Sequence, residues 1–515
     1  MKKTQKQIAL LCAAALLLQF AGCTEKPEEL PEEETAGTVT PSETEAPETA
    51  EPEEESFFQT INDDLPSDLD LGGRAVTFLS RGMEKTLHEL HVDEVNGEVV
   101  NDAVFEREAA VEERLNCAIE NLALGTDGHG GDLNTMVATS VRAGDNAYDV
   151  LANSNYSTTN TFASGNFLNL YNVENLNLEK EYWAQHLIES TAIGGVLFGV
   201  TGSISLFLYQ EMFAVFFNRD LCEEFGIKAD DVYQTVFDGK WTLDRMIEMT
   251  KDIYVDVNGD GTADEGDVYG YGLQVSSSTD GYWTSCQIRM TSRDENGGVY
   301  LDTDVEKLTA VVEKLQDFAY NQQGVIRLVE GSGYTDGVYL PEAFAKDQLL
   351  FMNDWIYSTE TGIFREMTSD YGIIPYPKYD EAQDDYYSYL HDAFTTFCIL
   401  TTVQNPGEVG AVMEAMASDS HNRVIPAYYE TALTTKYARD EASVTSLQTI
   451  FKNAYLDTGW VYSLNLNSYP QNTLREPVWR NSGSPTTKIA QLQKSVNKIL
   501  EKLSERFAAA AEKQG

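Results

Sequence analysis

Residues 256–267 read DVNGDGTADEGD, a spacing of oxygen-bearing side chains that is typical of a calcium-binding loop. In a twelve-residue loop of this kind, alternate positions supply ligands because the chain winds around the cation. Gly261 stands at the sixth position, where the chain must turn sharply. The sequence therefore predicts a structural Ca²⁺ site whose ligands come from Asp256, Asn258, Asp260, Thr262 (through its carbonyl), Asp264 and Asp267.

This loop differs in two ways from the paired loops of calcium sensors. Its last ligand is Asp267 instead of glutamate, so the ligand at that place is one methylene shorter. A helix is predicted before the loop at 243–253, but the segment after the loop, VYGYGLQV, has the pattern of a strand. We expect a single structural site with a dissociation constant of about 10⁻⁴ to 10⁻³ M. The alternative is an acidic surface turn that binds no metal.

Catalytic motifs are missing from the sequence. It contains no G-x-S-x-G elbow, no H-E-x-x-H and no P-loop. The 83 Asp and Glu residues provide so many carboxylate pairs that none of them singles out a glycosidase site. We therefore predict a protein that is not an enzyme, with a carbohydrate-active enzyme as the alternative.

Length and charge narrow the class of protein further. The chain has 515 residues and a net charge of −47, and 42% of its residues are hydrophobic. This hydrophobic content is sufficient for a large core, and the acidity excludes a nucleic-acid partner, because phosphate binding needs clustered Lys and Arg. The cysteines beyond the N-terminal region form no CxxC pair, so we predict free, buried thiols at Cys117, Cys222, Cys286 and Cys398.

The N-terminal region has the features of an export signal. Residues 1–22 carry three lysines, then an apolar run too short to span a membrane, then small residues before Cys23. The sequence Phe-Ala-Gly-Cys at 20–23 looks like a bacterial lipobox, although Phe20 stands where leucine is usual. We predict that Cys23 is lipidated and that 23–56, rich in Glu and Pro, is a disordered tether. The alternative is an ordinary secretory signal with an incidental cysteine.

After the tether, patterns typical of strands and of helices alternate along the chain. This alternation predicts an α/β fold with mainly parallel sheets. A polar loop is expected at 153–159. The predicted strands are 74–79, 117–122 and 148–152, and the predicted helices are 102–116, 243–253, 305–320, 408–417 and 489–507.

Taken in order, several segments resemble the extracellular solute-binding proteins of family 1, the maltodextrin-binding-like sugar-binding proteins of ABC transporters. The resemblance covers about residues 70–510, and Asp347 departs from it because glycine is usual there. The segments are NDAVFEREAAVEERLN (101–116), GGVLFGVTGSI (194–204), FAVFFNRDLCEEFGI (213–227), WTLDRMIEMTKDI (241–253), EAFAKDQLLFMNDW (342–355) and YGIIPYPK (371–378).

The resemblance implies a two-lobed periplasmic-binding-protein-like fold with a ligand cleft between the lobes. Lobe 1 would comprise 57–208 with 385–432, and lobe 2 would comprise 209–384 with 433–515. The chain would cross between the lobes near 205–212, 379–390 and 430–440.

It also implies the function of an extracytoplasmic lipoprotein receptor. Such a receptor captures a sugar or oligosaccharide by cleft closure and delivers it to the permease subunits of an ABC transporter. We expect a monomer on the extracellular face of the cell membrane, held there by its lipid anchor only. A surface glycan-binding lipoprotein without a permease is a further alternative.

For the ligand site, the resemblance and the general rule that ligands bind at the carboxyl ends of strands point to the same places. Trp355 lies where the family has a sugar-stacking aromatic residue, and Asp354 beside it is a possible hydroxyl acceptor. The other predicted ligand contacts are Arg81, Asn155, Tyr156, Trp283 and Asp392.

Overall fold

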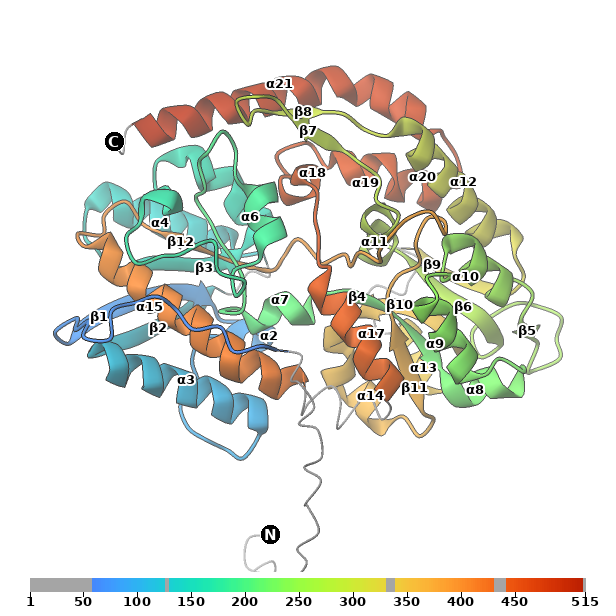
Figure 1. The fold of residues 1–515 in the computed structure, drawn as a ribbon. Coiled ribbons are helices and arrows are strands. Elements are labelled where there is room, and N and C mark those ends of the chain that lie inside the picture. Colours follow the sequence, from blue (N-terminus) through green and yellow to red (C-terminus); the bar gives the residue numbers. More distant parts are fainter. Residues whose placement is uncertain (1–57, 126–128, 330–338, 430–440, 513–515) are drawn as a thin grey trace, which may run out of the picture. The chain divides into compact units, whose positions relative to one another are not determined.

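The computed structural model describes residues 58–125, 129–329, 339–429 and 441–512. The predicted signal, Cys23, the tether and the crossover expected at 430–440 lie outside these residues. Residues 56–515 form one unit of the chain. Two separate sheets organise this unit, and we call the parts around them lobe 1 and lobe 2 (Figure 1).

The sheet of lobe 1 has the strand order β12-β3-β1-β2. The central strand β1 pairs in parallel with β2 and β3, whereas β12 runs antiparallel to β3. Parallel neighbours need crossover connections, and the helices α3 (Val99–Leu115) and α4 (Gly131–Ala143) provide them. The strands are β1 (Arg74–Arg81), β2 (Cys117–Gly125), β3 (Val150–Ser154) and β12 (Thr395–Ile399).

The polar loop predicted at 153–159 is wrong. Asn153 and Ser154 belong to β3 and pair with Thr396 and Thr395 of β12. A short helix, α5 (Asn155–Thr158), then begins directly. The polar residues favoured a loop in the sequence, but pairing with a strand about 240 residues later satisfies their backbone groups.

The sheet of lobe 2 has the order β11-β4-β10-β6-β5, and β9 also pairs with β6. β10 is antiparallel to β4 and parallel to β6. Every residue of β4 is buried, as expected for a central strand covered on both faces. The strands are β4 (Phe213–Asn218), β5 (Tyr254–Val255), β6 (Val268–Val275), β9 (Val325–Val329), β10 (Leu349–Trp355) and β11 (Tyr371–Ile374), and β7 (Thr291–Arg293) forms a separate hairpin with β8 (Val299–Leu301).

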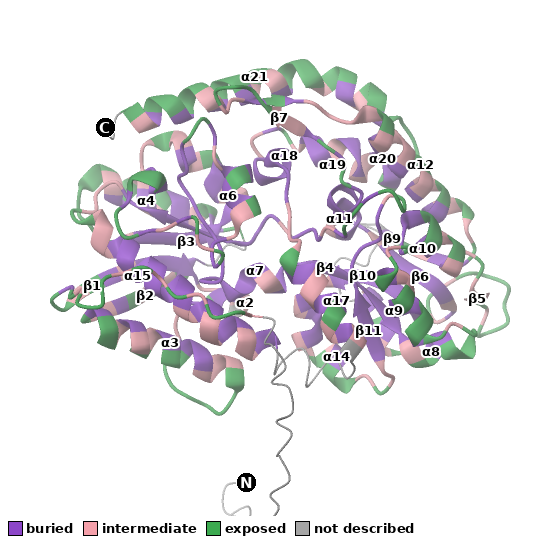
Figure 2. Cartoon of the chain, viewed as in Figure 1, coloured by how far each residue is buried: buried purple, intermediate pink, exposed green. Residues whose placement is uncertain are grey.

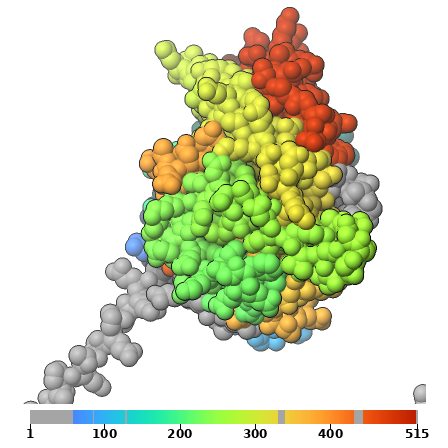
Figure 3. All heavy atoms as spheres, turned by 90° about the vertical axis from the view of Figure 1, so that its right-hand side faces the viewer, coloured from blue at the N-terminus to red at the C-terminus, as the bar shows by residue number. Residues whose placement is uncertain are grey.

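Helices surround both sheets, with their exposed faces outward (Figure 2). Segments that hold α8 to α12 cover the side of lobe 2 that Figure 3 shows. No described helix is long and apolar enough to cross a membrane. The remaining helices are α2 (Glu84–Leu87), η1 (Thr159–Ser164), η2 (Leu170–Asn172), α6 (Gln185–Thr191), α7 (Leu206–Gln210), α8 (Arg219–Glu224), α9 (Ala229–Phe237), α10 (Leu243–Thr250), α11 (Ser277–Ser285), α12 (Val305–Asn321), α13 (Tyr339–Ala345), η3 (Ile356–Glu360), α14 (Gly362–Glu366), α15 (Pro406–Asp419), η4 (Ser420–Val424), α17 (Glu441–Lys452), α18 (Thr458–Val461), α19 (Tyr469–Thr473), α20 (Arg475–Arg480) and α21 (Pro485–Glu512).

Several chain segments connect the two lobes. The connection from α7 to β4 forms an isolated bridge between Met212 and Leu390, and Ser388 forms another with Ala454. These bridges place the connections at Met212 and at Ser388–Leu390 side by side with the segment around Ala454. The C-terminal helix α21 contacts η1 of lobe 1 as well as β8 and α12 of lobe 2. Its burial pattern explains this position, because Ile489, Val496, Leu503 and Phe507 form a buried stripe on one face.

Candidate functional site

Polar and aromatic side chains from both lobes meet at the carboxyl ends of the strands. β1 ends at Arg81, β3 is followed by Tyr156, and β10 ends at Trp355. Charged residues of the interlobe connections lie within electrostatic reach of them. This is the edge at which open α/β sheets bind ligands. We call the group the interlobe cluster; it consists of Arg81, Lys85, Tyr156, Glu211, Asp280, Asp354, Trp355, His391, Asp392 and Arg475.

Arg81 is almost fully buried, with 1% of its surface exposed. Its guanidinium donates hydrogen bonds to the carbonyl of Ala393 (2.9 Å) and to Oγ1 of Thr395 (2.7 Å). Thr395 in turn donates to the buried Glu89. Burial lowers the pKa of Arg81, and Glu89 and Glu211 oppose this shift. The predicted ligand contact thus ties the end of β1 to the start of β12, and its donors are largely committed to the protein.

Tyr156 and Asp392 are held together by the backbone. The amide of Tyr156 donates to the carbonyl of Asp392 (2.8 Å), and the carboxylate of Asp392 accepts from Oγ of Ser463 (2.9 Å). The Tyr156 ring is half-buried and tilted against His129, with ring centroids 4.9 Å apart. Partial burial and the nearby Asp392 raise the pKa of the Tyr156 hydroxyl, which therefore stays protonated and able to donate.

Asn155 lies one residue earlier and is fully buried. Its amide nitrogen donates to the carbonyl of Val461 (3.2 Å), whereas its Oδ1 has no hydrogen-bond partner. This hydrogen bond joins α5 to α18, and the predicted role of Asn155 as a ligand contact stays a prediction. The side chain joins lobe 1 to the segment after α17.

Asp354 and Trp355 end β10 on the lobe 2 side of the cluster. Asp354 accepts hydrogen bonds from the amide of Trp355 (2.9 Å) and from Oγ of Ser358 (2.7 Å). Burial raises the pKa of the Asp354 carboxyl to about 7, although Lys85 and both hydrogen bonds act in the opposite direction. Trp355 is half-buried, and its ring contacts Tyr357 edge-on at 5.7 Å between centroids. The buried carboxylate of Asp354 therefore fixes the backbone amide of Trp355, the predicted stacking residue.

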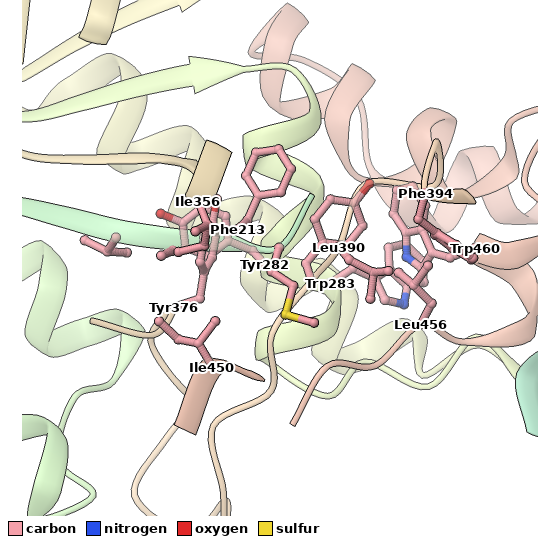
Figure 4. Close-up of a cluster of buried hydrophobic side chains, with 14 of the residues drawn as sticks. Phe213, Tyr282, Trp283, Ile356, Tyr376, Leu390, Phe394, Ile450, Leu456 and Trp460 are labelled. Atoms are coloured by element: carbon pink, nitrogen blue, oxygen red, sulfur yellow. The ribbon is translucent and has the colours of Figure 1, made fainter. Parts of the chain in front are cut away.

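Trp283 lies in the hydrophobic core and not in the cluster. It is 1% exposed and meets Trp460 edge-on, with ring centroids 6.2 Å apart. Figure 4 shows both indoles among the buried side chains around Leu390 and Phe394. As in most cases, a buried aromatic side chain in a helix serves packing.

The sequence reasoning missed half of the interlobe cluster. Glu211 follows α7 at one of the predicted crossovers; it is 2% exposed, its Oε2 has no hydrogen-bond partner, and Nδ1 of His391 lies 3.3 Å from that oxygen. Burial raises the pKa of the Glu211 carboxyl, and His391, Lys85 and Arg81 oppose the shift. The positions of Glu211 at a crossover and of His391 next to Asp392 were the only signals in the sequence.

A buried ion pair was also missed. Asp280 in α11 is fully buried and accepts two hydrogen bonds from Arg475 of α20, one of them from Nε at 3.1 Å. Burial raises the pKa of the Asp280 carboxyl to about 6, against the effect of Arg475. Asp392 and His391 also act on this carboxyl, so the pair belongs to the same cluster. The two residues are 195 positions apart, and no local pattern in the sequence connects them.

The predicted calcium loop joins β5 to β6. Gly261 has a φ of +77°, and the first three predicted ligand side chains accept hydrogen bonds from backbone amides two to five residues later. Oδ1 of Asp264 is buried and has no hydrogen-bond partner. Burial, Asp267 and Asp260 raise the pKa of the Asp264 carboxyl. This unpartnered oxygen of Asp264 is a suitable ligand for a cation.

The carboxylate of Asp267, the last predicted ligand, is engaged by hydrogen bonds within the protein. Asp267 accepts from the amide of Val257 (3.0 Å) and from the hydroxyl of Tyr254 (2.9 Å). Within the part of the chain that the structure describes, no three His, Cys, Asp or Glu residues form a group that could hold a metal. Calcium therefore stays a prediction.

The four cysteines of the folded unit are free, as predicted. Cys222, Cys286 and Cys398 are buried, and burial raises their thiol pKa values. Cys117 is only partly buried. High thiol pKa values make these cysteines poor nucleophiles and metal ligands.

A separate cavity of about 640 Å³ borders the α7–β4 connection. Its lining includes Tyr182, Tyr209, Met212, His421 and Phe451, and it contains none of the predicted ligand contacts. Met212 lines this cavity, whereas the preceding residue, Glu211, belongs to the interlobe cluster. The cavity is therefore distinct from the candidate site.

Comparison with known proteins identifies the fold. No family model matches the sequence, and no curated protein matches it significantly. Many solved structures do match the structure. The GacH receptor of Streptomyces glaucescens, solved without ligand and with acarbose, is 13% identical; the match covers 83% of this chain and 99% of that chain, with a TM-score of 0.52.

Two further matches have different ligands. The galacto-N-biose-/lacto-N-biose I-binding protein of a Bifidobacterium longum ABC transporter is 13% identical, with a TM-score of 0.53 over 85% of this chain and 98% of that chain. UgpB from Mycobacterium tuberculosis, in complex with glycerophosphocholine, is 12% identical, with a TM-score of 0.54 over 84% and 99%. The chain therefore has the two-lobed α/β fold of ABC-transporter solute-binding proteins, which confirms the predicted fold class.

Proposed function

We propose that the chain is the extracytoplasmic substrate-binding lipoprotein of an ABC importer and captures a sugar or oligosaccharide between its lobes. The observation that carries this proposal is the half-buried Trp355 at the end of β10, with Tyr357 beside it and polar residues of lobe 1 opposite. Aromatic faces stack on sugar rings, and the carboxylates and hydroxyls of the cluster are of the kinds that bind sugar hydroxyls. No covalent chemistry is required of these residues.

The fold supports this function. Two lobes joined by short chain connections, such as those at Met212 and Leu390, can close on a ligand by a hinge motion. The structural neighbours include proteins whose bound ligands are acarbose and lacto-N-biose. UgpB with glycerophosphocholine indicates that the same fold also accepts a solute that is not a sugar.

The membrane attachment and the metal belong to the same proposal. Residues 1–22 would direct export, Cys23 would carry the lipid, and 23–56 would hold a monomeric receptor at the outer face of the membrane, near its permease. The loop at 256–267 would bind Ca²⁺ through the ligands given above, with Asp264 supplying the acceptor that has no partner within the protein. Its role would be to stabilise the β5–β6 connection.

Thermal unfolding of residues 57–515 with a panel of mono- and oligosaccharides tests the ligand class. Glycerophosphodiesters and polyols complete the panel. A sugar at 100 times its dissociation constant should stabilise the protein by about 2.7 kcal/mol. The sugar must also be recovered unchanged, since hydrolysis would indicate a carbohydrate-active enzyme. A shift with a phosphodiester alone would contradict the sugar assignment, and no shift at all would contradict the receptor.

A variant locates the site. Trp355→Ala should weaken binding of the selected sugar by about fivefold or more, because a stacked ring contributes on the order of 1–2 kcal/mol. Trp479→Ala is the matched control, since Trp479 is an exposed indole of α20 outside the cluster. Equal binding by both variants would place the sugar elsewhere.

A further inference from the structure

The Trp355 ring is covered by a cation from the other lobe. Nζ of Lys85, in the short helix α2 after β1, lies 3.6 Å from the centroid of Trp355. The same Nζ lies 4.8 Å from the centroid of Tyr357. An ammonium within about 6 Å of an aromatic face is attracted by the ring quadrupole. Lys85 therefore makes a cation–π contact with two rings, and this contact connects lobe 1 to lobe 2.

The surroundings of Lys85 favour this position. Burial lowers the pKa of its ammonium, and the carboxylates of Glu211 and Asp354 oppose the shift. No described carboxylate forms a direct ion pair with Nζ, and Asp354 is already engaged by Ser358 and the Trp355 amide. The two rings are therefore the direct partners of the ammonium, and the two acids attract it from a greater distance.

The location of this contact matters for ligand binding. A sugar ring stacked on an indole occupies the space a few ångströms above its face, and Nζ lies in that space. Both groups cannot cover the same face of Trp355 at once. The neighbouring Tyr357 meets Trp355 edge-on, so it does not offer the same stacking face.

We infer that Lys85 is an interlobe latch: its ammonium holds the lobes together over Trp355, and a stacking ligand must displace it. This inference rests on the proposed function for the identity of the site, but the latch itself requires no sugar. Lys85 then helps to determine specificity, because only a ligand whose contacts outweigh the cation–π contact gains access to the ring. Loss of the latch weakens the unliganded closed form and leaves the sugar complex unchanged.

The first test uses the protein without sugar. In Lys85→Met the stem remains and the charge is lost, whereas Lys85→Arg keeps a cation over the rings. We expect small-angle scattering to show a larger radius of gyration for Lys85→Met, and tryptophan emission to change with it. Both signals should stay near those of the original protein in Lys85→Arg. Lys240→Met is the control, since Lys240 is an exposed lysine whose partner, Asp238, lies in lobe 2.

A double variant assigns the emission change to the proposed contact. In a Trp355→Phe background, Lys85→Met should leave tryptophan emission unaltered, because the indole that Lys85 covers is gone. An equal change in both backgrounds would overturn the inference, since Lys85 would then act on another tryptophan. Unaltered scattering and emission in Lys85→Met would overturn it as well.

The second test uses a sugar that stabilises the original protein. Lys85→Met should bind this sugar about fivefold more tightly, because displacement no longer costs a cation–π contact of about 1 kcal/mol. Unchanged binding would overturn the displacement step, because Lys85 would then have no effect on the sugar. Weaker binding would overturn it as well, because Lys85 would then contact the sugar directly. If no sugar of the panel binds, the proposed function fails, while the scattering and emission data still decide whether the latch exists.

Discussion

The calcium-type loop and the interlobe cluster both contain several carboxylates, but they are built in opposite ways. In the loop, all six predicted ligands lie within 256–267; three of them are exposed, and Asp267 alone is buried. In the cluster, the acids Glu211, Asp280 and Asp354 are buried and come from different segments of the chain. The pKa values of the buried acids rise chiefly through burial.

This difference determines how each region responds to a change. Charges at the surface of the loop are screened by water, so changing one of them has a small effect unless a cation binds. Charges in the cluster are desolvated, so removing a partner leaves a costly buried ion behind. Buried, electrostatically coupled groups at strand ends are also the commoner signature of a functional site.

The largest effect should come from Arg475. Arg475→Met leaves the carboxylate of the fully buried Asp280 without its cation, and we expect a loss of about 3–5 kcal/mol in the free energy of unfolding. Urea denaturation at pH 8 measures this loss. Arg480→Met is the control, because its partner Glu476 lies in the same helix at the surface and the pair contributes about 0–1 kcal/mol.

A second variant separates charge from packing. In Arg475→Met combined with Asp280→Asn, no buried ion remains, so most of the lost stability should return. If the double variant is as unstable as Arg475→Met, the contribution of Arg475 comes from packing between α20 and α11. The burial of the Asp280 charge would then not explain why losing Arg475 costs more stability than losing Arg480.

The next effect is a pH dependence at Asp354. Burial raises the pKa of its carboxyl from 3.8 to about 7, so the folded protein binds this proton more tightly than the unfolded chain does. The resulting stability is fully present below pH 4 and is lost as the pH rises through 7. Asp354→Asn has no carboxyl to ionise and does not suffer this loss. The free energy of unfolding of the variant, relative to that of the original protein, should therefore be up to about 4 kcal/mol more favourable at pH 8 than at pH 4.

Melting temperatures between pH 4 and pH 8 check this prediction. The control is Asp238→Asn, since hydrogen bonds from Lys240 and Gln234 lower the pKa of the exposed Asp238 carboxyl. That variant should gain nothing from a rise in pH. Parallel curves for Asp354→Asn and the original protein would mean that the Asp354 carboxyl is solvated.

The same comparison explains how much could be predicted from the sequence. The calcium-type loop could be predicted because all of its residues are neighbours in the chain, and its metal stays a prediction. The elements β1, α3 and α12 were predicted correctly from local periodicity. Trp355 and Asp354 were located through the resemblance of 342–355 to a known family. These signals are all local in the sequence.

The rest of the site depends on contacts between distant segments. Asp280 meets Arg475 only because α11 and α20 pack together, and Lys85 reaches Trp355 across the two lobes. Whether an aromatic residue is in the core or in a site is likewise decided by tertiary packing, as the burial of Trp283 shows. Neither composition nor periodicity contains this information.

The smallest effect should come from the loop, and its sign should depend on calcium. Without calcium, Asp264→Asn removes repulsion from Asp260 and Asp267, so the melting temperature should rise slightly. With 10 mM calcium, the original protein should gain about 1.4–2.7 kcal/mol, given a dissociation constant of about 10⁻⁴ to 10⁻³ M, and the variant should gain much less. Asp294→Asn, in the turn between β7 and β8, should respond to calcium as the original protein does. An equal calcium response in all three proteins would mean that the loop is an acidic surface turn that binds no metal. Of the two regions compared, only the buried cluster would then be a candidate binding site.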